Sequence, residues 1–335
     1  MKDQDGSFFE KILIKPTLHK TMPIPDVMTI TLNPAVDIVT STDRVIANHK
    51  LRCGNALEHP GGGGINVARV LQRFGVNVQA LYPMGGVTGV WHKRLLDEEV
   101  VRTLVVEISN ETRESFSVHE TSTSHDYRFI LPGPFISQTE LAEFRDVFTS
   151  NLPKQYVVVS GGLAPGVPID FFADLIHLSK KNDLRVILDS NGPCLNLALA
   201  QGVYLFKPSL SELCSLSPTQ LTGRDEYIKF CKQLINEGKA EIIALSLAEQ
   251  GAILVTRNNT WYAASLSVEI KTTVGAGDSF VGAMIWALIQ NNTLEKSFAY
   301  GMAGGAAALL NSGTSLCHVE DVRRLVSEVK LIEIE

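Results

Sequence analysis

Thr272-Thr273-Val274-Gly275-Ala276-Gly277-Asp278-Ser279-Phe280 is the stretch that decides the fold of this chain. A β-branched run resembling the end of a strand meets two glycines, and an apolar helix is expected over residues 281–288. The glycines let backbone N–H groups point into one concavity at the helix N-terminus. Unpaired N–H groups and the helix dipole both favour an anion there. The stretch therefore predicts an anion site at a strand-to-helix turn.

Asp278 stands in that same turn, where its charge would repel a bound anion. One interpretation is catalytic: Asp278 accepts the proton of a hydroxyl that attacks phosphorus, while the amides of residues 275–277 hold the transferring phosphoryl group. The other interpretation is structural, because an Asp at a helix N-terminus often caps it. The turn alone leaves both open.

Composition describes an ordinary globular protein of 335 residues, 45% apolar and 20% charged. A net charge of −6 gives no reason to expect nucleic acid or an anionic membrane as a partner. No apolar run reaches the roughly 20 residues of a membrane-spanning helix. The cysteines lack metal-ligand spacing and predict free thiols in a reducing compartment, hence a cytoplasmic location; they are residues 53, 194, 214, 231 and 317.

The chain is expected to divide into an extension, residues 1–26, and one domain, residues 27–330. Charges interrupt the apolar residues of the extension, and Pro23 and Pro25 separate it from the first strand. A disordered leader and a locally packed segment both remain open.

Asp37 closely follows the first predicted strand, residues 27–32. Loops at the carboxyl ends of parallel strands form ligand crevices, so its carboxylate can bind the hydroxyls of a polyol, although an isolated Asp there is more often a turn former. Short β-like runs over residues 38–58 predict a small antiparallel flap. Lys50 and Arg52 would share one face of its strand, where they either clamp a phosphate or solvate an edge.

Four consecutive glycines precede a helix in Pro60-Gly61-Gly62-Gly63-Gly64-Ile65-Asn66. Such a run is entropically costly, and close backbone approach to a ligand is the usual reason for it. A flexible linker is the alternative, but linkers seldom lead straight into an amphipathic helix. We therefore expect a ligand loop, with the Asn66 amide available to a hydroxyl.

Strands and helices alternate through most of the chain, with strands expected at residues 76–82, 156–160, 185–189, 204–207 and 241–246. This alternation predicts a mainly parallel sheet covered by helices. Residues 101–131 return to β alternation and are expected to complete the flap. A small flap with an apolar face predicts a homodimer through that face.

The glycine run with Asn66 and the Gly275–Asp278 turn closely resemble the two signatures of the ribokinase-like (PfkB-type) carbohydrate kinases, and most closely the minor-type bacterial 6-phosphofructokinases. The resemblance covers residues 28–330 and implies a three-layer α/β sandwich with a mainly parallel sheet and a small β lid. It implies ATP and Mg²⁺ as cofactors. It assigns the sugar phosphate to Asp37, Lys50, Arg52, Gly61, Gly62, Asn66 and Arg113, and catalysis to Asp278 with Gly275, Ala276 and Gly277.

The nucleotide side and the metals are also implied by this resemblance. The nucleotide residues would be Lys207, Ser209, Ser246 and Gly251, besides Gly275 and Gly277. Glu212 would position the waters of Mg²⁺. A loop for a monovalent cation, K⁺, would involve Thr272, Val274, Asn311 and Gly313.

Several residues depart from the pattern of these kinases. Ser209 replaces an Asn, which weakens the case for metal handling, and Ser209 with Glu212 also has the spacing of a helix capping box. Gly162 and Ala248 replace a Ser and a Gly, and Ser315 replaces an arginine.

The activity implied is ATP-dependent phosphorylation of a sugar phosphate, with fructose 6-phosphate phosphorylated at O1 as the first choice. Relatives that act on fructose 1-phosphate or tagatose 6-phosphate often carry Lys at the position of Gly63. A 1-phosphofructokinase or a tagatose-6-phosphate kinase remains the alternative. A catalytically weak sugar-phosphate sensor is the alternative of a different class.

Overall fold

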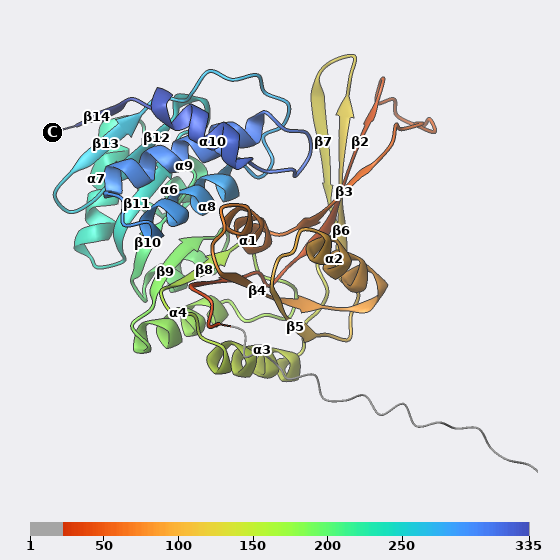
Figure 1. Cartoon of the computed structure of the whole chain (residues 1–335), viewed down its shortest axis with the longest axis horizontal. Coiled ribbons are helices and arrows are strands. Elements are labelled where there is room, and N and C mark those ends of the chain that lie inside the picture. Colours follow the sequence, from red (N-terminus) through yellow and green to blue (C-terminus); the bar gives the residue numbers. More distant parts are fainter. Residues whose placement is uncertain (1–22, 335) are drawn as a thin grey trace, which may run out of the picture.

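Short and largely apolar runs form a central sheet of ten strands in this computed structural model, which describes residues 23–334. Their order across the sheet is β14-β13-β12-β11-β10-β9-β8-β1-β4-β5 (Figure 1). The strands are β1 Val27–Ile30, β4 Val78–Met84, β5 Thr103–Glu107, β8 Tyr156–Ser160, β9 Arg185–Asp189, β10 Val203–Phe206, β11 Ala240–Ser246, β12 Ala252–Val255, β13 Thr260–Ala263 and β14 Leu331–Glu333.

The strands from β5 to β11 in that order all pair in parallel, and β12, β13 and β14 add an antiparallel edge. The expected mainly parallel sheet is thus confirmed. Because the strands are parallel, their carboxyl ends lie along one edge of the sheet, where ligand-binding loops of such folds gather.

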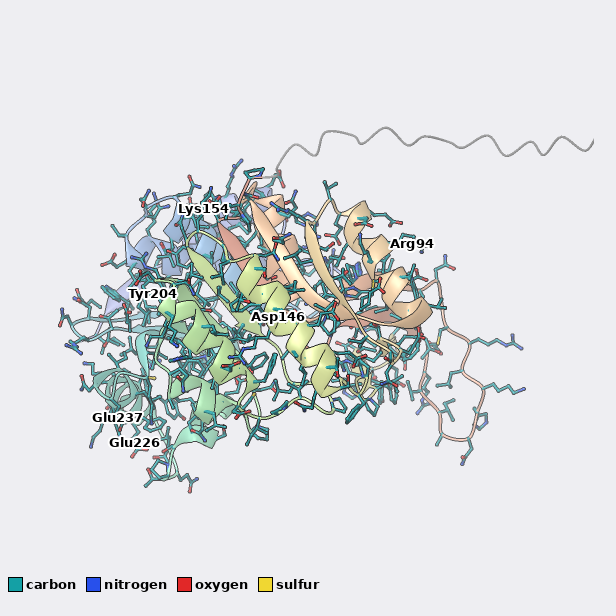
Figure 2. The ribbon with its side chains drawn as sticks, turned by 90° about the horizontal axis from the view of Figure 1, so that it is seen from below. Arg94, Asp146, Lys154, Tyr204, Glu226 and Glu237 are labelled. Atoms are coloured by element: carbon teal, nitrogen blue, oxygen red, sulfur yellow. The ribbon has the colours of Figure 1, made fainter. Side chains whose placement is uncertain are left out.

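Helices cover both faces of the sheet and complete a three-layer sandwich, as expected (Figure 1). One face is covered by α1 Gly63–Arg73, α2 Gly86–Glu98, α8 Ala276–Ile289 and α9 Leu294–Leu309, on which α10 Val319–Leu325 packs. The other face is covered by α3 Gln138–Ser150, α4 Phe171–Lys181, α5 Leu195–Leu199, α6 Leu210–Leu216 and α7 Arg224–Asn236. Charged side chains such as Arg94, Asp146 and Glu226 lie on the outer faces of these helices (Figure 2).

A second sheet of four strands, here called the lid, stands apart from the sandwich (Figure 1). Its order is β3-β2-β6-β7, with β2 Ala35–Thr42, β3 Leu57–Gly61, β6 Arg113–Glu120 and β7 His125–Ile130. Only β2 and β6 pair in parallel; the other pairs are antiparallel.

The lid differs from the expected flap in three ways. Its central strands, β2 and β6, are parallel, whereas an antiparallel flap was expected. Residues 43–56 form no strand and connect β2 to β3 as an exposed segment. β5, although it lies within the range 101–131, pairs with β4 in the large sheet. Alternation alone cannot distinguish a half-exposed edge strand of the large sheet from a strand of the lid, because both bury one face.

Residues 1–22 of the expected extension lie outside the described residues, whereas residues 23–26 pack locally. The Arg102 guanidinium donates to the Pro23 carbonyl at 2.7 Å, and the Lys154 N–H donates to the Pro25 carbonyl at 2.9 Å. Among residues 23–334, no helix combines the length and the apolar character needed to cross a membrane.

Candidate active site

The turn at Gly275 begins helix α8 as the sequence predicts. Gly275 has φ of 76°, in the left-handed region, and a Cβ built there would lie 2.4 Å from the Leu316 side chain. Both facts favour glycine. The residues before the turn are irregular, however, because β13 ends at Ala263. The prediction of a strand that leads directly into the turn was therefore wrong.

Asp278 lies in the first turn of α8 and receives a hydrogen bond at 2.8 Å from the amide of Asn66, on α1. Burial and the nearby Asp189 carboxylate raise the pKa of Asp278 to about 7, against the opposing effects of Asn66 and Lys207. A carboxylate whose pKa lies near neutrality is a better proton acceptor than an ordinary aspartate. The arrangement therefore suits a general base.

The glycine loop lies close to strand β2 of the lid on one side and to the end of β8 on the other. A Cβ at Gly61 would lie 2.3 Å from the Asp37 carboxylate, and one at Gly63 would lie 2.2 Å from the Ser160 hydroxyl. Gly62 has φ of 124°, which side chains disfavour. The run of glycines is therefore required by close approach of backbone and side chains.

Asp37 lies on β2 of the lid and is half-buried. Burial raises its pKa, while a hydrogen bond from the Thr314 hydroxyl at 3.2 Å and the charges of Arg113, Arg128 and Arg69 oppose that rise. Asp37 is thus held beside Gly61, with cations nearby.

Arg113 begins β6 and donates to the carbonyls of Leu131 at 3.2 Å and Asn33 at 3.1 Å. Its Nε is buried without a partner among the described residues, and burial lowers the pKa of the guanidinium. Arg128 on β7 pairs with Ser117 of β6, which is four residues along β6 from Arg113, so both arginines point to the same face of the lid.

Arg128 was not among the predicted site residues. The available signal was the alternation of side chains along the two strands of a hairpin, which places Arg113 and Arg128 on the same face. Lys50 and Arg52 are both in the exposed segment 43–56 and not on a strand. The prediction that they share one strand face was wrong, because this segment lacks the pairing that would fix its alternation.

Lys207 follows β10, is 7% exposed, and forms an ion pair with Asp189 at 3.0 Å. Burial lowers its pKa, but the carboxylates of Asp189, Glu212 and Asp278 outweigh burial and raise it. Its Nζ lies 3.3 Å from the position of a Cβ on Gly277, so the ammonium sits beside the turn of α8. Asp189, which ends β9, was missed by the sequence analysis; its place at the carboxyl end of a buried strand was the available signal.

Ser209 and Glu212 form the capping box of α6. The Ser209 hydroxyl accepts from the Glu212 N–H at 3.3 Å, and Glu212 accepts from the Ser209 N–H at 2.7 Å. Ser209 also forms a bridge with Ser246 at the end of β11, so these predicted nucleotide residues are adjacent.

Gly251 has φ of 94°, and a Cβ there would lie 2.0 Å from the Ala263 carbonyl oxygen. Ala248 has φ of 54°, which explains the glycine expected at this position in the resembled kinases.

The residues expected around K⁺ come from two segments that meet where Gly275 packs on Leu316. The Thr272 hydroxyl accepts from the Val274 N–H at 3.2 Å, and the Asn311 amide donates to the Leu316 carbonyl at 2.8 Å. Gly313 has φ of 59° and packs on the lid. In the described part of the chain, no three His, Cys, Asp or Glu side chains gather as metal ligands.

Comparisons with known proteins match this geometry. A model described as pfkB family carbohydrate kinase matches residues 27–321. The chain is 38% identical over 300 residues to an ATP-dependent 6-phosphofructokinase isozyme 2 of Escherichia coli (strain K12), covering 89% of this chain and 97% of that protein. It is 40% identical over 304 residues to the protein of the same name from Mycobacterium tuberculosis (strain ATCC 25618 / H37Rv), covering 90% and 88%.

Among solved structures, the phosphofructokinase-2 of Escherichia coli in complex with substrates and products superposes with a TM-score of 0.87 at 37% identity, over 90% of this chain and 98% of that one. The same enzyme in complex with potassium gives the same TM-score over 91% and 99%. Less similar proteins include a 1-phosphofructokinase of Bacillus subtilis (strain 168), 30% identical over 308 residues, or 92% of this chain and all of that one.

Proposed function

Because the chain belongs to the pfkB family of carbohydrate kinases, we propose that it transfers the γ-phosphoryl group of ATP to O1 of fructose 6-phosphate. The protein is a sugar-phosphate kinase of the phosphofructokinase type. The observation that carries the proposal is the position of Asp278 at a helix N-terminus, where it is hydrogen-bonded to Asn66 and near enough to the Asp37 carboxylate and the buried Lys207 ammonium for both charges to act on its pKa.

In the proposed reaction the O1 hydroxyl attacks the γ-phosphorus in line, and the bond from phosphorus to the β,γ-bridging oxygen breaks to release ADP. Asp278 takes the hydroxyl proton. The N–H groups of Gly275, Ala276 and Gly277 stabilise the charge on the transferring group, and Lys207 adds a positive charge beside them.

The carboxylates near Lys207 fit the Mg²⁺ that such kinases use. One carboxylate oxygen of Glu212 accepts a hydrogen bond from the Ser209 N–H. The negative charges of Glu212 and Asp189 both raise the pKa of Lys207, so both carboxylates lie near its ammonium. Mg²⁺ is commonly held by one or two carboxylates together with phosphate oxygens and waters, so two suffice. Bound there, Mg²⁺ would neutralise charge on the phosphates.

The sugar side of the proposal rests on the lid. Asp37, Gly61, Gly62 and Asn66 would receive the sugar hydroxyls. Arg113 would bind the phosphate, assisted by Arg128 on the same face, and Lys50 and Arg52 would approach from the segment 43–56; these roles are proposals.

The nucleotide side of the proposal lies at the ends of β10 and β11. ATP would contact Lys207, Ser209, Ser246 and Gly251, which the bridge between Ser209 and Ser246 supports. The Escherichia coli enzyme has been solved in complex with potassium, which supports K⁺ as a ligand; its site around Thr272, Val274, Asn311 and Gly313 is our proposal.

Dimerisation through the lid is also proposed. Phe116 on β6 pairs with Phe129 on β7, and Phe129 is 54% exposed. A four-stranded sheet with exposed aromatic side chains buries them when two copies pair. One structure of the Escherichia coli enzyme is described as its tetrameric inhibited form, which shows that this relative forms oligomers. A cytoplasmic location stays a prediction.

A coupled assay of ADP release tests the proposed function. Fructose 6-phosphate, fructose 1-phosphate and tagatose 6-phosphate would be compared by kcat/KM with saturating ATP and Mg²⁺, with the Asp278→Asn variant as the control for contaminating kinases. We expect the highest value for fructose 6-phosphate. A higher value for either other sugar phosphate would reassign the substrate, and ADP release that no sugar phosphate stimulates would refute the proposal.

A further inference from the structure

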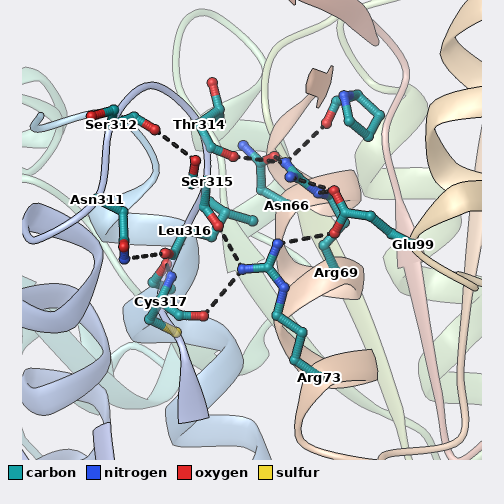
Figure 3. Close-up of polar contacts among 12 residues, drawn as sticks. Asn66, Arg69, Arg73, Glu99, Asn311, Ser312, Thr314, Ser315, Leu316 and Cys317 are labelled. Atoms are coloured by element: carbon teal, nitrogen blue, oxygen red, sulfur yellow. Dashed lines mark hydrogen bonds and ion pairs between the residues drawn. The ribbon is translucent and has the colours of Figure 1, made fainter. Parts of the chain in front are cut away.

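Arg69 is a buried charged side chain, 1% exposed, on the face of α1 that packs against its neighbours. Its Nε donates to Glu99 at 2.8 Å, and its Nη2 lies 2.6 Å from the same carboxylate (Figure 3). Glu99 also pairs with Arg73, one turn further along α1, at 3.0 Å. Glu99 thus places one negative charge between two arginines, engages Nε and Nη2 of Arg69, and leaves the Nη1 of Arg69 for other partners.

Nη1 of Arg69 reaches three oxygen atoms from three parts of the chain. They are the Asn66 side-chain oxygen at 3.1 Å, the Thr314 carbonyl at 3.0 Å and the Pro60 carbonyl at 3.2 Å (Figure 3). Pro60 lies in β3 of the lid, and Thr314 lies between α9 and α10. One nitrogen therefore connects the lid, helix α1 and the loop after α9.

The contact with Asn66 fixes the direction of its amide. A guanidinium can only donate hydrogen bonds, so the Asn66 atom that faces Arg69 has to be the oxygen. The NH₂ group then faces Asp278, to which it donates at 2.8 Å. If the amide were reversed, its oxygen would face the carboxylate and its NH₂ group would face the guanidinium, and both contacts would be repulsive.

The contact between Arg69 and Thr314 positions a hydrogen-bond donor in the same way, here for the Asp37 carboxylate. Its carbonyl accepts from Arg69 while its hydroxyl donates to Asp37 at 3.2 Å. We infer that Arg69 is a positioning residue for both substrate-side carboxylates: it aims the Asn66 amide at Asp278 and holds the Thr314 hydroxyl against Asp37. The catalytic part of this inference rests on the proposed function; the geometric part does not.

A consequence for proton transfer follows from the direction of the Asn66 amide. The groups that face Asp278 are Asn66 from α1, Asp37 from the lid, Asp189 from β9 and Lys207 after β10. Asn66 lowers the pKa of Asp278, whereas burial and the two carboxylates raise it. Without Arg69 the amide is free to turn away, so the pKa of Asp278 should rise further.

The test compares Arg69→Met with Arg73→Met. Arg73 shares Glu99 and also donates to the loop after α9, at the Ser315 and Cys317 carbonyls. Within residues 23–334, however, it makes no hydrogen bond to Asn66 or Thr314. Both variants lose one arginine of the Glu99 cluster, so a general loss of stability should affect both. Only Arg69→Met should raise the pKa of Asp278, by about one pH unit or more for the loss of a hydrogen bond to a charged group.

That pKa is measured on the free protein by ¹³C NMR of the aspartate side-chain carboxyl groups, assigned with Asp278→Asn. The same change should move the low-pH limb of kcat/KM for fructose 6-phosphate, with both variants and the wild type measured on identical substrates. In an Asn66→Ala background Arg69→Met should no longer move the pKa, because the side chain through which it acts is gone.

Should Arg69→Met fail to fold, the double variant Arg69→Met with Glu99→Leu removes both charges of the ion pair, so that neither is left without its partner, and serves in its place. An Asp278 pKa that moves equally in Arg69→Met and Arg73→Met, or an effect of Arg69→Met that persists without Asn66, would overturn the inference. If the wild type proves inactive on every sugar phosphate, the proposed function fails, and the NMR titration still decides whether Arg69 positions Asn66.

Discussion

Replacing Asp278 by Asn should have opposite effects on activity and on stability. The amide cannot accept the hydroxyl proton, so kcat should fall about 10²- to 10⁴-fold, the usual contribution of a positioned base. This corresponds to a rise in the barrier of roughly 3 to 5 kcal/mol. The amide oxygen can still accept the hydrogen bond that Asn66 donates to the carboxylate at 2.8 Å, so the fold should persist.

The gain in stability follows from the pKa of Asp278, which burial and Asp189 raise from 3.8 to about 7. Between these values the folded protein holds a proton that the unfolded chain has lost, so Asp278 lowers the free energy of unfolding as pH rises from about 4 to about 7. A difference of about three pH units is worth about 4 kcal/mol at most. Asp278→Asn lacks this penalty and should be more stable than the wild type above pH 7, with little difference near pH 4.

Two measurements decide the matter. Coupled ADP release gives kcat, and urea unfolding at a series of pH values between 4 and 8 gives the free energy of unfolding. Asp225→Asn is the matched control, because Asp225 also lies in the first turn of a helix, α7, but is exposed. A variant that keeps more than about a tenth of wild-type kcat would refute the catalytic role. A stability difference that is independent of pH would refute the assignment of the raised pKa.

Three further predictions concern the lid. Arg113→Ala should raise KM for the sugar phosphate about tenfold or more and leave KM for ATP unchanged, since charge-assisted hydrogen bonds contribute about 1.5 to 3 kcal/mol; equal changes in both would indicate a structural role. Gly61→Ala puts a Cβ 2.3 Å from the Asp37 carboxylate. Titration calorimetry should therefore show that the variant no longer binds the sugar phosphate but still binds ATP. An affinity for the sugar phosphate equal to that of the wild type would contradict this close approach. Phe129→Asp should lower both the oligomer mass measured by light scattering and the affinity for the sugar phosphate. Ile332→Asp, at a 58% exposed position on β14 outside the lid, is the control and should change neither. A wild-type protein that is fully active as a monomer would exclude the lid dimer.

Features that depend on short stretches of chain could be predicted from the sequence. The strand bounds of β8 and β9 match the expected residues, because continuous apolar runs define buried parallel strands. The two glycine turns were also predicted, since their backbone geometry and close approaches leave few other residues acceptable.

Features that depend on distant pairing could not be predicted in this way. The segment 43–56 alternates like a strand but has no partner strand, so its pattern carried no information about which face Lys50 and Arg52 take. The pairs Lys207 with Asp189 and Arg69 with Glu99 join separate elements. No spacing in the sequence marks them, because each ion pair is set by the packing of elements around the sheet.

The sequence left open whether Asp278 is a base or a helix cap, and the helices of this protein supply their own comparison. Glu140 in α3 and Glu212 in α6 occupy the third helical position, as Asp278 does in α8, and each accepts a hydrogen bond from the backbone of its N-cap residue, as a cap does. The carboxylate of Asp278 instead takes its hydrogen bond from Asn66, 212 residues away, and no capping bond within α8 is present among the described residues. A carboxylate that only stabilised its helix would gain most from the local N–H groups. The carboxylate of Asp278 is instead turned away from these N–H groups, in a partly buried position where its pKa is raised, and this arrangement favours a proton acceptor over a cap.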